Sequence, residues 1–270
     1  MLVPRVPESL DPLLSQAIGS LAYAANRRAR DAVRANLAVI VPALEVPQRD
    51  RLVRRAFVNQ ARNYFRTLRL PRLSPQEVLR RVAVVGWEHV VAAKGRRRGL
   101  IFATAHLGPL ILVGQAIFAR GEVVTVVAEA IEPRQFALIN RRLRGAVGAS
   151  FVTQHDVRAM FRVLAQGGAI GVLADRVVGG VGVRVPFFGR KALLPSGHVE
   201  LAMRTGAAII PGFAVRADGR ERAELLPPLE LAPGRGDDVV RENVRRWAAV
   251  LERYVAAAPD EWAVFEPVWD

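Results

Sequence analysis

A regular alternation of strand-like and helix-like segments begins near residue 81 and constrains the fold more than any other feature of the sequence. Short runs rich in Val, Ile and Ala are separated by stretches of helical length, which is the βα rhythm of a mainly parallel sheet. The expected strands are Val82–Val85, Gly99–Ala105, Glu122–Ala128, Ala149–Thr153 and Ala169–Ala174. The expected helices between them cover residues 87–93, 109–120, 133–144 and 156–166. We therefore predict an α/β fold whose central sheet is mainly parallel and flanked by helices.

The two ends of the chain follow other patterns. After the alternation, the expected elements are strands Val181–Pro186, Ala207–Arg216 and Arg222–Leu231, a hairpin turn at Asp218-Gly219, and an amphipathic helix over 237–257. Residues 8–70 have apolar positions at helical spacing, interrupted at Pro42 and Pro47. We predict an N-terminal helical cap over residues 1–75, part of the same fold, followed by an α/β domain over residues 76–270.

The charge of the chain points to anionic partners. There are 39 Lys and Arg residues against 25 Asp and Glu residues, a net charge of +14, and Lys94 and Lys191 are the only lysines. Arginine binds phosphate bidentately, although a GC-rich genome also favours arginine over lysine. No aromatic residues interleave with the arginines in a nucleic-acid motif, so we expect no nucleic-acid partner. Around residues 48–68 the arginines form either a solvated face over a buried stripe or an amphipathic surface against anionic lipid.

Neither a membrane span nor cysteine chemistry is expected. No run of about 18 apolar residues occurs, and the first residues lack the pattern of a signal peptide. We expect the protein to be peripheral to the cytoplasmic face of the inner membrane. With no cysteines, the sequence excludes disulfides, thiolate zinc sites and cysteine nucleophiles. No two histidines have the spacing of metal ligands, so we expect no metal.

Three titratable residues stand where expected strands end. His106, Glu129 and Asp175 each follow such a strand directly. In parallel α/β sheets, ligands bind beyond the carboxyl ends of the strands. A histidine held by a carboxylate is a competent general base, because the acid fixes its tautomer and stabilises the imidazolium. A histidine at a strand end is also common for structural reasons, so the pattern alone leaves both readings open.

The turn after His106 adds to this interpretation. It reads Leu107-Gly108-Pro109, and a proline fits the first turn of the helix that follows. The N–H groups at that helix start would face an anion or a developing oxyanion, which makes Gly108 a candidate substrate contact.

A second unusual segment contains Phe187, Phe188, Gly189, Arg190 and Lys191. Adjacent aromatic rings beside two cations could hold a phosphate or a lipid head group. The alternative is a buried aromatic turn with both cations in solvent.

Several of these pieces, in this order, resemble the bacterial lipid A biosynthesis acyltransferases, within the lysophospholipid acyltransferase superfamily. The likeness covers about residues 30–268. Its main motifs are Gly86-Trp87-Glu88-His89, Thr104-Ala105-His106-Leu107-Gly108, Gly168 to Arg176, Val185-Pro186-Phe187-Phe188-Gly189-Arg190, Pro195-x-Gly197, Leu201 to Ala207 and Pro259-Asp260-Glu261-Trp262.

The resemblance implies an enzyme that transfers a fatty acyl group from an acyl carrier protein or coenzyme A thioester to a hydroxyl, with no further cofactor. His106 matches the family's general base. Asp175 matches the acid of an Asp-Gln element, with Arg176 in place of the glutamine. The residues that match a block holding the acceptor's phosphate are Phe187, Phe188, Gly189 and Arg190.

One departure bears directly on catalysis. The family's signature is His, four residues, then Asp or Glu, and here the acidic position holds Ile111. If the enzyme is active, another acid is expected to take this role; Glu129 is our first choice, Asp175 the second and Glu200 the third. The alternatives are a catalytically lapsed relative that binds acyl chains or lipid, and an unrelated basic surface protein.

Overall fold

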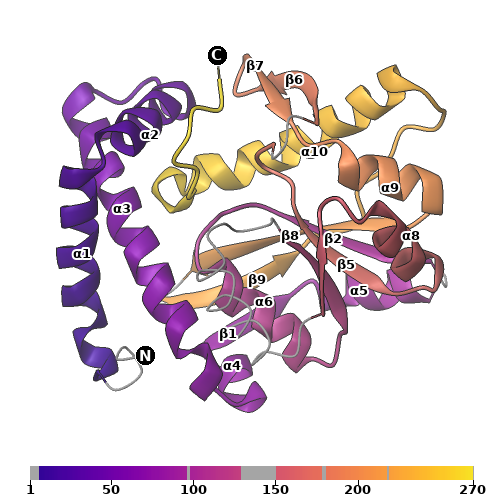
Figure 1. Ribbon diagram of the computed structural model, residues 1–270, viewed down its shortest axis with the longest axis horizontal. Coiled ribbons are helices and arrows are strands. Elements are labelled where there is room, and N and C mark those ends of the chain that lie inside the picture. The colour runs from indigo at the N-terminus through magenta and orange to yellow at the C-terminus, as the bar shows by residue number, and fades with distance from the viewer. Residues whose placement is uncertain (1–5, 96–97, 129–149, 178–180, 218, 270) are drawn as a thin grey trace.

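The computed structural model describes residues 6–95, 98–128, 150–177, 181–217 and 219–269 (Figure 1). Within these ranges, seven strands form one sheet in the order β1-β9-β8-β2-β5-β3-β4. Neighbouring strands are parallel except for the antiparallel pair β8 and β9. In sheet order, the strands are β1 Val82–Val85, β9 Arg220–Leu225, β8 Ala208–Ala217, β2 Leu100–Thr104, β5 Ala169–Leu173, β3 Val124–Ala128 and β4 Ser150–Thr153. The predicted α/β fold with a mainly parallel sheet is confirmed.

Strand β2 shows why apolar runs predict this sheet. Its side chains alternate between two cores, because successive residues of a strand point to opposite faces. Ile101 and Ala103 belong to the core on one face, whereas Leu100 and Phe102 belong to the core on the other. A central strand covered on both faces must be apolar throughout, which produces the continuous run in the sequence.

Helices cover both faces of the sheet (Figure 1). The core containing Ile101 takes side chains from α8 Val157–Ala165, α9 Gly197–Thr205 and α10 Asp237–Ala257. The core containing Leu100 takes side chains from α4 Pro75–Arg81, α5 Trp87–Lys94 and α6 Leu110–Ala119. Three short 3₁₀ helices are η2 Glu8–Leu10, η3 Leu70–Arg72 and η4 Pro259–Glu261.

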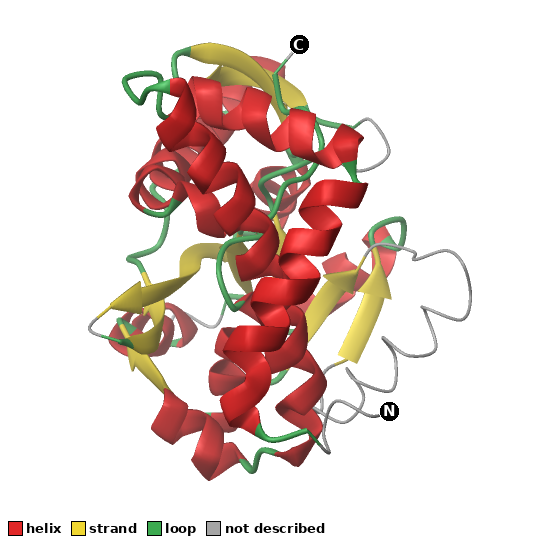
Figure 2. Ribbon diagram, turned by 90° about the vertical axis from the view of Figure 1, so that its left-hand side faces the viewer, coloured by secondary structure: helices red, strands yellow, loops and turns green. Residues whose placement is uncertain are grey.

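The N-terminal segment is helical, as expected. Its helices are α1 Asp11–Ala25, α2 Arg27–Ile40 and α3 Val46–Arg69, and Figure 2 shows them in front of the sheet. The Asn26 side chain caps α2 by accepting a hydrogen bond from the Ala29 N–H. No described helix combines the length and apolar character that a membrane crossing requires. The domain boundary at residue 75 stays a prediction.

A separate hairpin packs on α10. It consists of β6 Val183–Phe187 and β7 Arg190–Leu194, which pair antiparallel. The two residues between them, Phe188 and Gly189, have φ angles of 51° and 72°. Two consecutive positive φ angles are the requirement of a tight two-residue hairpin turn, and glycine meets it without steric cost.

Three further expectations concern a strand, a helix and a hairpin. The expected strand Arg222–Leu231 is too long: β9 runs from Arg220 to Leu225, because Pro227 and Pro228 cannot donate ladder hydrogen bonds. The expected helix over 133–144 lies outside the described residues. The hairpin expected between the last two strands is present, since β8 and β9 pair antiparallel from Ala217 and Arg220 onward.

One histidine, His198, is buried in the core although it is a polar residue. His198, on α9, is 4% exposed, and neither ring nitrogen has a hydrogen-bond partner in the described structure. Its ring packs edge-on against Trp247, with ring centroids 5.4 Å apart. Burial lowers the pKa of His198 to about 3.

His198 is therefore expected to make stability depend on pH. Because the folded-state pKa lies below the unfolded value of about 6.5, protonation favours unfolding, and stability is lost as pH falls from about 6.5 toward 3. The loss by pH 4.5 is of order 3 kcal/mol. His198→Phe should flatten urea-unfolding stability against pH over this range, whereas His155→Phe, at an exposed position, should not. Equal slopes in both variants would contradict the assignment.

Candidate active site

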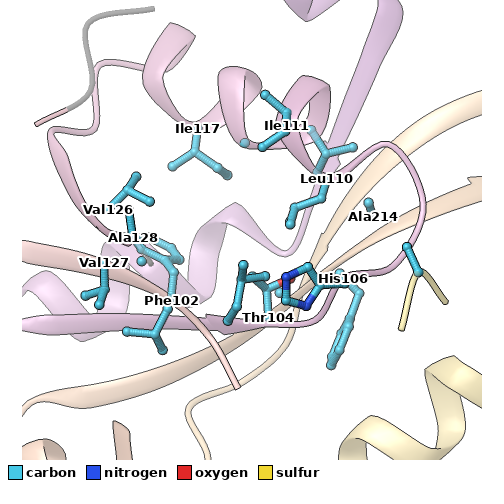
Figure 3. Close-up of a pocket in the computed structure, with 18 of the residues that line it drawn as sticks. Phe102, Thr104, His106, Leu110, Ile111, Ile117, Val126, Val127, Ala128 and Ala214 are labelled. Carbon is cyan, nitrogen blue, oxygen red and sulfur yellow. The ribbon is translucent and has the colours of Figure 1, made fainter. Parts of the chain in front are cut away.

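His106 lies just beyond the carboxyl end of β2, at the edge of the sheet where ligands bind in this class of fold. Its side chain is 26% exposed. It lines a cavity of about 620 Å³. Figure 3 shows His106 at one end of this cavity and Val126, Val127 and Ala128 at the other.

Asp175 is the carboxylate that meets this histidine. The Nδ1 atom of His106 lies 2.9 Å from Oδ1 of Asp175, and the His106 backbone N–H donates to Oδ2 at 2.9 Å. The register explains the meeting, because β2 and β5 are parallel neighbours with Thr104 opposite Leu173. His106 is two residues beyond Thr104, and Asp175 is two residues beyond Leu173, so the two side chains follow neighbouring strand ends.

A third donor completes the environment of Asp175. The indole Nε1–H of Trp262 donates to Oδ2 at 2.9 Å, and the carboxylate itself is completely buried. Burial alone would raise the pKa of Asp175, but the charge of His106 and the hydrogen bonds from His106 and Trp262 outweigh it. The pKa of Asp175 is therefore lowered, so the residue is an ionised partner for the imidazole at neutral pH.

The segment that carries Trp262 also fixes the turn after His106. The Gly108 N–H donates to the Glu261 carbonyl at 3.0 Å, and the Ala263 N–H donates to the His106 carbonyl at 2.7 Å. The N–H group of Gly108 is therefore engaged within the protein in this structure, and the role of Gly108 as a substrate contact stays a prediction. The carbonyl of Gly108 accepts from the Asn63 side chain at 2.9 Å. The turn is therefore hydrogen-bonded both to the C-terminal segment and to α3.

The cavity wall is mainly apolar. Ile111, at the position of the missing acid, is part of this wall and is 38% exposed. Arg176 also lines the cavity, and its guanidinium forms an ion pair with Glu266 at 3.0 Å. The apolar lining comes from β2, β3, β4, β5, β8, β9 and α6, and includes Phe102, Leu110, Val113, Ile117, Phe118, Val124, Phe151, Val172, Leu173, Phe213, Ala214 and Leu225.

The aromatic segment lies elsewhere. Phe187 is completely buried, stacked on Trp269 and edge-on to Trp262. A side chain without exposed surface cannot contact an acceptor in this conformation. Phe188, Gly189 and Arg190 form the hairpin turn and its exit, and none of the four is among the residues that line the cavity. Their role in holding a phosphate stays a prediction.

The structure describes one of the two other candidate acids. Glu129 lies outside the described residues. Glu200 is on α9, where it accepts a hydrogen bond from the Ser196 hydroxyl at 2.7 Å. Among the residues that the structure describes, no group of three histidine, aspartate or glutamate side chains could hold a metal ion.

Trp262 is the residue that sequence reasoning missed. It stands in a quoted motif, Pro259-Asp260-Glu261-Trp262, but nothing in its local sequence indicates a contact with Asp175. The two residues are 87 positions apart. A buried carboxylate requires several donors, which is the only signal that could have prompted a search for one.

A histidine–aspartate pair at one end of a large apolar cavity, on a mainly parallel sheet, is an arrangement that can hold a general base beside an apolar ligand. The chain belongs to the bacterial lipid A biosynthesis acyltransferases, whose family model matches residues 1–270.

The chain is similar to several known proteins. The phosphatidylinositol mannoside acyltransferase of Mycolicibacterium smegmatis is 27% identical over 254 residues, covering 92% of this chain and 82% of that protein. The lipid A biosynthesis lauroyltransferase of Escherichia coli is 24% identical over 270 residues, covering 97% and 85%. The crystal structure of the 1-acyl-sn-glycerophosphate acyltransferase PlsC from Thermotoga maritima matches with a TM-score of 0.39 and 16% identity, covering 90% and 97%.

The contact between Trp262 and Asp175 leads to a prediction. Trp262→Phe keeps an aromatic ring in the core but removes one donor to a buried charge. We expect kcat for acyl transfer to fall about tenfold or more, with KM for the acyl donor nearly unchanged. Trp269→Phe is the matched control, because it removes an indole donor that binds the Phe187 carbonyl instead. Equal kcat values in the two variants would show that the contact does not support catalysis.

Proposed function

We propose that this protein transfers a fatty acyl group from an acyl carrier protein or acyl coenzyme A thioester to a hydroxyl of a lipid or glycolipid acceptor. The observation that carries the proposal is the 2.9 Å contact between His106 Nδ1 and buried, ionised Asp175. It supplies the acid that Ile111 cannot, and it supports His106 as the general base.

The proposed chemistry follows from the orientation of the ring. Nδ1 is engaged with Asp175, so Nε2 is the nitrogen that would take the proton of the acceptor hydroxyl. The acceptor oxygen attacks the thioester carbonyl carbon, the tetrahedral intermediate collapses, and the sulfur leaves with the proton returned by the imidazolium. Asp175 keeps the ring in the required tautomer and stabilises its positive charge. No net proton or electron is gained or lost.

The cavity is proposed to bind the acyl chain. Its apolar wall would bury methylene groups, and each buried methylene contributes about 0.8 kcal/mol. Ile111 fits this role, because an isoleucine extends the apolar wall where a carboxylate would add a charge. The names of the two relatives support an acceptor from glycolipid or lipid synthesis.

A second candidate function is a lapsed relative that binds acyl chains without transferring them. Ile111 is the specific observation that favours it. The retained base, with a carboxylate bonded both to its ring and to its backbone, favours the active enzyme instead.

We also propose that the protein works as a peripheral protein on the cytoplasmic face of the inner membrane, against an anionic surface. Helix α1 exposes large apolar side chains that a solvated helix would normally turn inward. Leu13 is 67% exposed and Leu21 is 69% exposed. The net charge of +14 favours anionic lipid.

The proposed mechanism predicts that His106→Ala abolishes release of free thiol from long-chain acyl thioesters in the presence of an acceptor. Asp175→Asn should reduce the rate by about 10²–10⁴-fold, because it loses the charge that orients the ring. Thiol release is followed with a thiol-reactive dye over a screen of hydroxyl acceptors. Glu200→Gln, at the acid that does not meet His106, is the control. Unchanged turnover in His106→Ala would remove the mechanism.

The proposed acyl site predicts a change in chain-length preference. Gly114, on α6, lines the cavity, and a Cβ atom added there meets nothing within 4 Å. Gly114→Leu should therefore fill part of the cavity and shift the preferred donor to shorter acyl chains, measured by competition between thioesters of different length. Gly197→Leu, at a glycine with equal space outside the cavity, should leave the preference unchanged. If both variants showed the same chain-length preference, the acyl chain would have to bind outside this cavity.

A further inference from the structure

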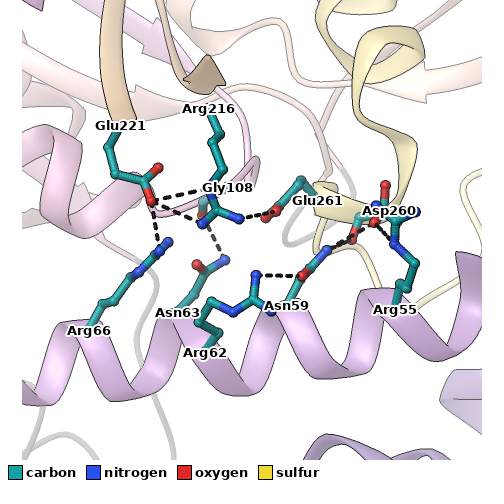
Figure 4. Close-up of polar contacts among 10 residues, drawn as sticks. All are labelled: Arg55, Asn59, Arg62, Asn63, Arg66, Gly108, Arg216, Glu221, Asp260 and Glu261. Carbon is teal, nitrogen blue, oxygen red and sulfur yellow. Dashed lines mark hydrogen bonds and ion pairs between the residues drawn. The ribbon is translucent and has the colours of Figure 1, made fainter. Parts of the chain in front are cut away.

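A second, smaller hollow lies on another side of α3. Its volume is about 220 Å³. It is bounded by α1, α3, the end of β8 and the short helix η4, and Figure 4 shows most of the polar side chains around it. The lining residues are Gln16, Arg54, Arg55, Val58, Asn59, Arg62, Arg216 and Glu261.

The hollow is distinct from the apolar cavity, although the same segments supply both. Helix α3 contributes Gln60 and Tyr64 to the cavity but Asn59 and Arg62 to the hollow. Strand β8 and the C-terminal segment divide in the same way, with Ala214 and Ala263 on the cavity side and Arg216 and Glu261 on the hollow side. No residue of the proposed catalytic pair touches the hollow.

Positive charge is in excess around the hollow. Arg55 pairs with Asp260 at 2.9 Å, whereas Arg66 and Arg216 share one carboxylate, Glu221, at 2.7 and 3.0 Å. Including Glu261, which Arg216 approaches at 3.6 Å, three carboxylates face five arginines, so among the described residues the group has an excess of two positive charges. The five arginines are Arg54, Arg55, Arg62, Arg66 and Arg216.

Two of the lining arginines form no ion pair within the described part of the chain. Arg62 donates to the amide oxygen of Asn59 at 3.3 Å. Arg54 lies over the ring of Tyr23, 5.2 Å from its centroid. Neither guanidinium is within ion-pair distance of a described carboxylate, although the charge of Arg62 acts on Glu261 at longer range.

Arg66 is buried close to other positive charges. Its Nη1 atom is buried without a hydrogen-bond partner. Burial is the main cause that lowers the pKa of Arg66, and the neighbouring charges of Arg216 and Arg62 lower it further against the attraction of Glu221. A bound anion would relieve this positive potential.

We propose that the hollow between α1, α3 and η4 binds a phosphate group. Guanidinium groups bind phosphate oxygens in bidentate pairs, and an excess of two positive charges matches a phosphate dianion. The side-chain amide of Gln16 offers a further donor at the same wall, whereas the amide of Asn59 already donates to Asp260. The site goes beyond the proposed acyl transfer and does not depend on it.

The phosphate has two possible sources, which share this chemistry. One is the head group of an anionic phospholipid, which the exposed leucines of α1 would suit, since α1 also lines the hollow through Gln16. The other is a soluble phosphate or phosphate monoester. An experiment with two arms separates them.

In the first arm, inorganic phosphate and glycerol 3-phosphate are titrated into the full chain by calorimetry. In the second, the protein is sedimented with vesicles of phosphatidylcholine, with or without phosphatidate. Both arms use Arg62→Gln and the control Arg241→Gln. Arg241 is an exposed arginine on α10 that pairs with Asp238. Each variant loses one positive charge, so any general attraction to anions falls equally.

We expect wild type and Arg241→Gln to bind in at least one arm, and Arg62→Gln to bind about tenfold more weakly or worse. Binding of soluble phosphate identifies the soluble source, and binding only to phosphatidate vesicles identifies the lipid. Arg54→Gln provides a second variant should Arg62→Gln unfold, as judged by circular dichroism. The proposal is overturned by no binding in either arm, or by equal binding of the hollow variants and the control. Neither outcome bears on thiol release, which tests the acyltransferase separately.

Discussion

The buried carboxylate of Asp175 is the constraint on which the site depends. An ionised group with no exposed surface costs several kcal/mol unless its oxygens are satisfied. Here two donors come from His106 and one from Trp262. These contacts require β2, β5 and the C-terminal segment to be in place together. The geometry of the proposed base is therefore a consequence of the completed fold and not of the local sequence around His106.

This dependence explains what the sequence could and could not predict. The apolar runs predicted the sheet, because a parallel strand covered on both faces has no polar side to show. They contain no information on strand order. β5 lies between β2 and β3, so Asp175, two residues beyond the end of β5, reaches His106, whereas β3 is one strand further away. The strand order therefore favours Asp175, the second choice from the sequence, as the partner of His106, whereas Glu129, the first choice, lies outside the described residues.

The aromatic segment shows a different limit. Two phenylalanines, a glycine and a cation suggest a ligand site by composition, and the same residues are equally suited to a hairpin turn above a buried ring. The structure places Phe187 against Trp262 and Trp269, so it reaches the proposed site only indirectly, by packing on the indole that bonds to Asp175. Composition describes which contacts a residue can make, but burial decides which of them it makes.

The same reasoning explains how Ile111 can occupy the position at which the family signature described above has an acid. Position 111 is in the first turn of α6 and faces the apolar cavity. A carboxylate there would need its own donors, and the nearby N–H groups of Gly108 and Leu110 are already bonded to Glu261 and Gly108. Asp175 approaches the imidazole from the adjacent strand instead, with its donors supplied from behind the cavity wall. An acid just beyond β5 thus keeps a carboxylate out of the apolar wall at position 111 while the imidazole keeps its partner, so the proposed base and the proposed acyl site can share one wall.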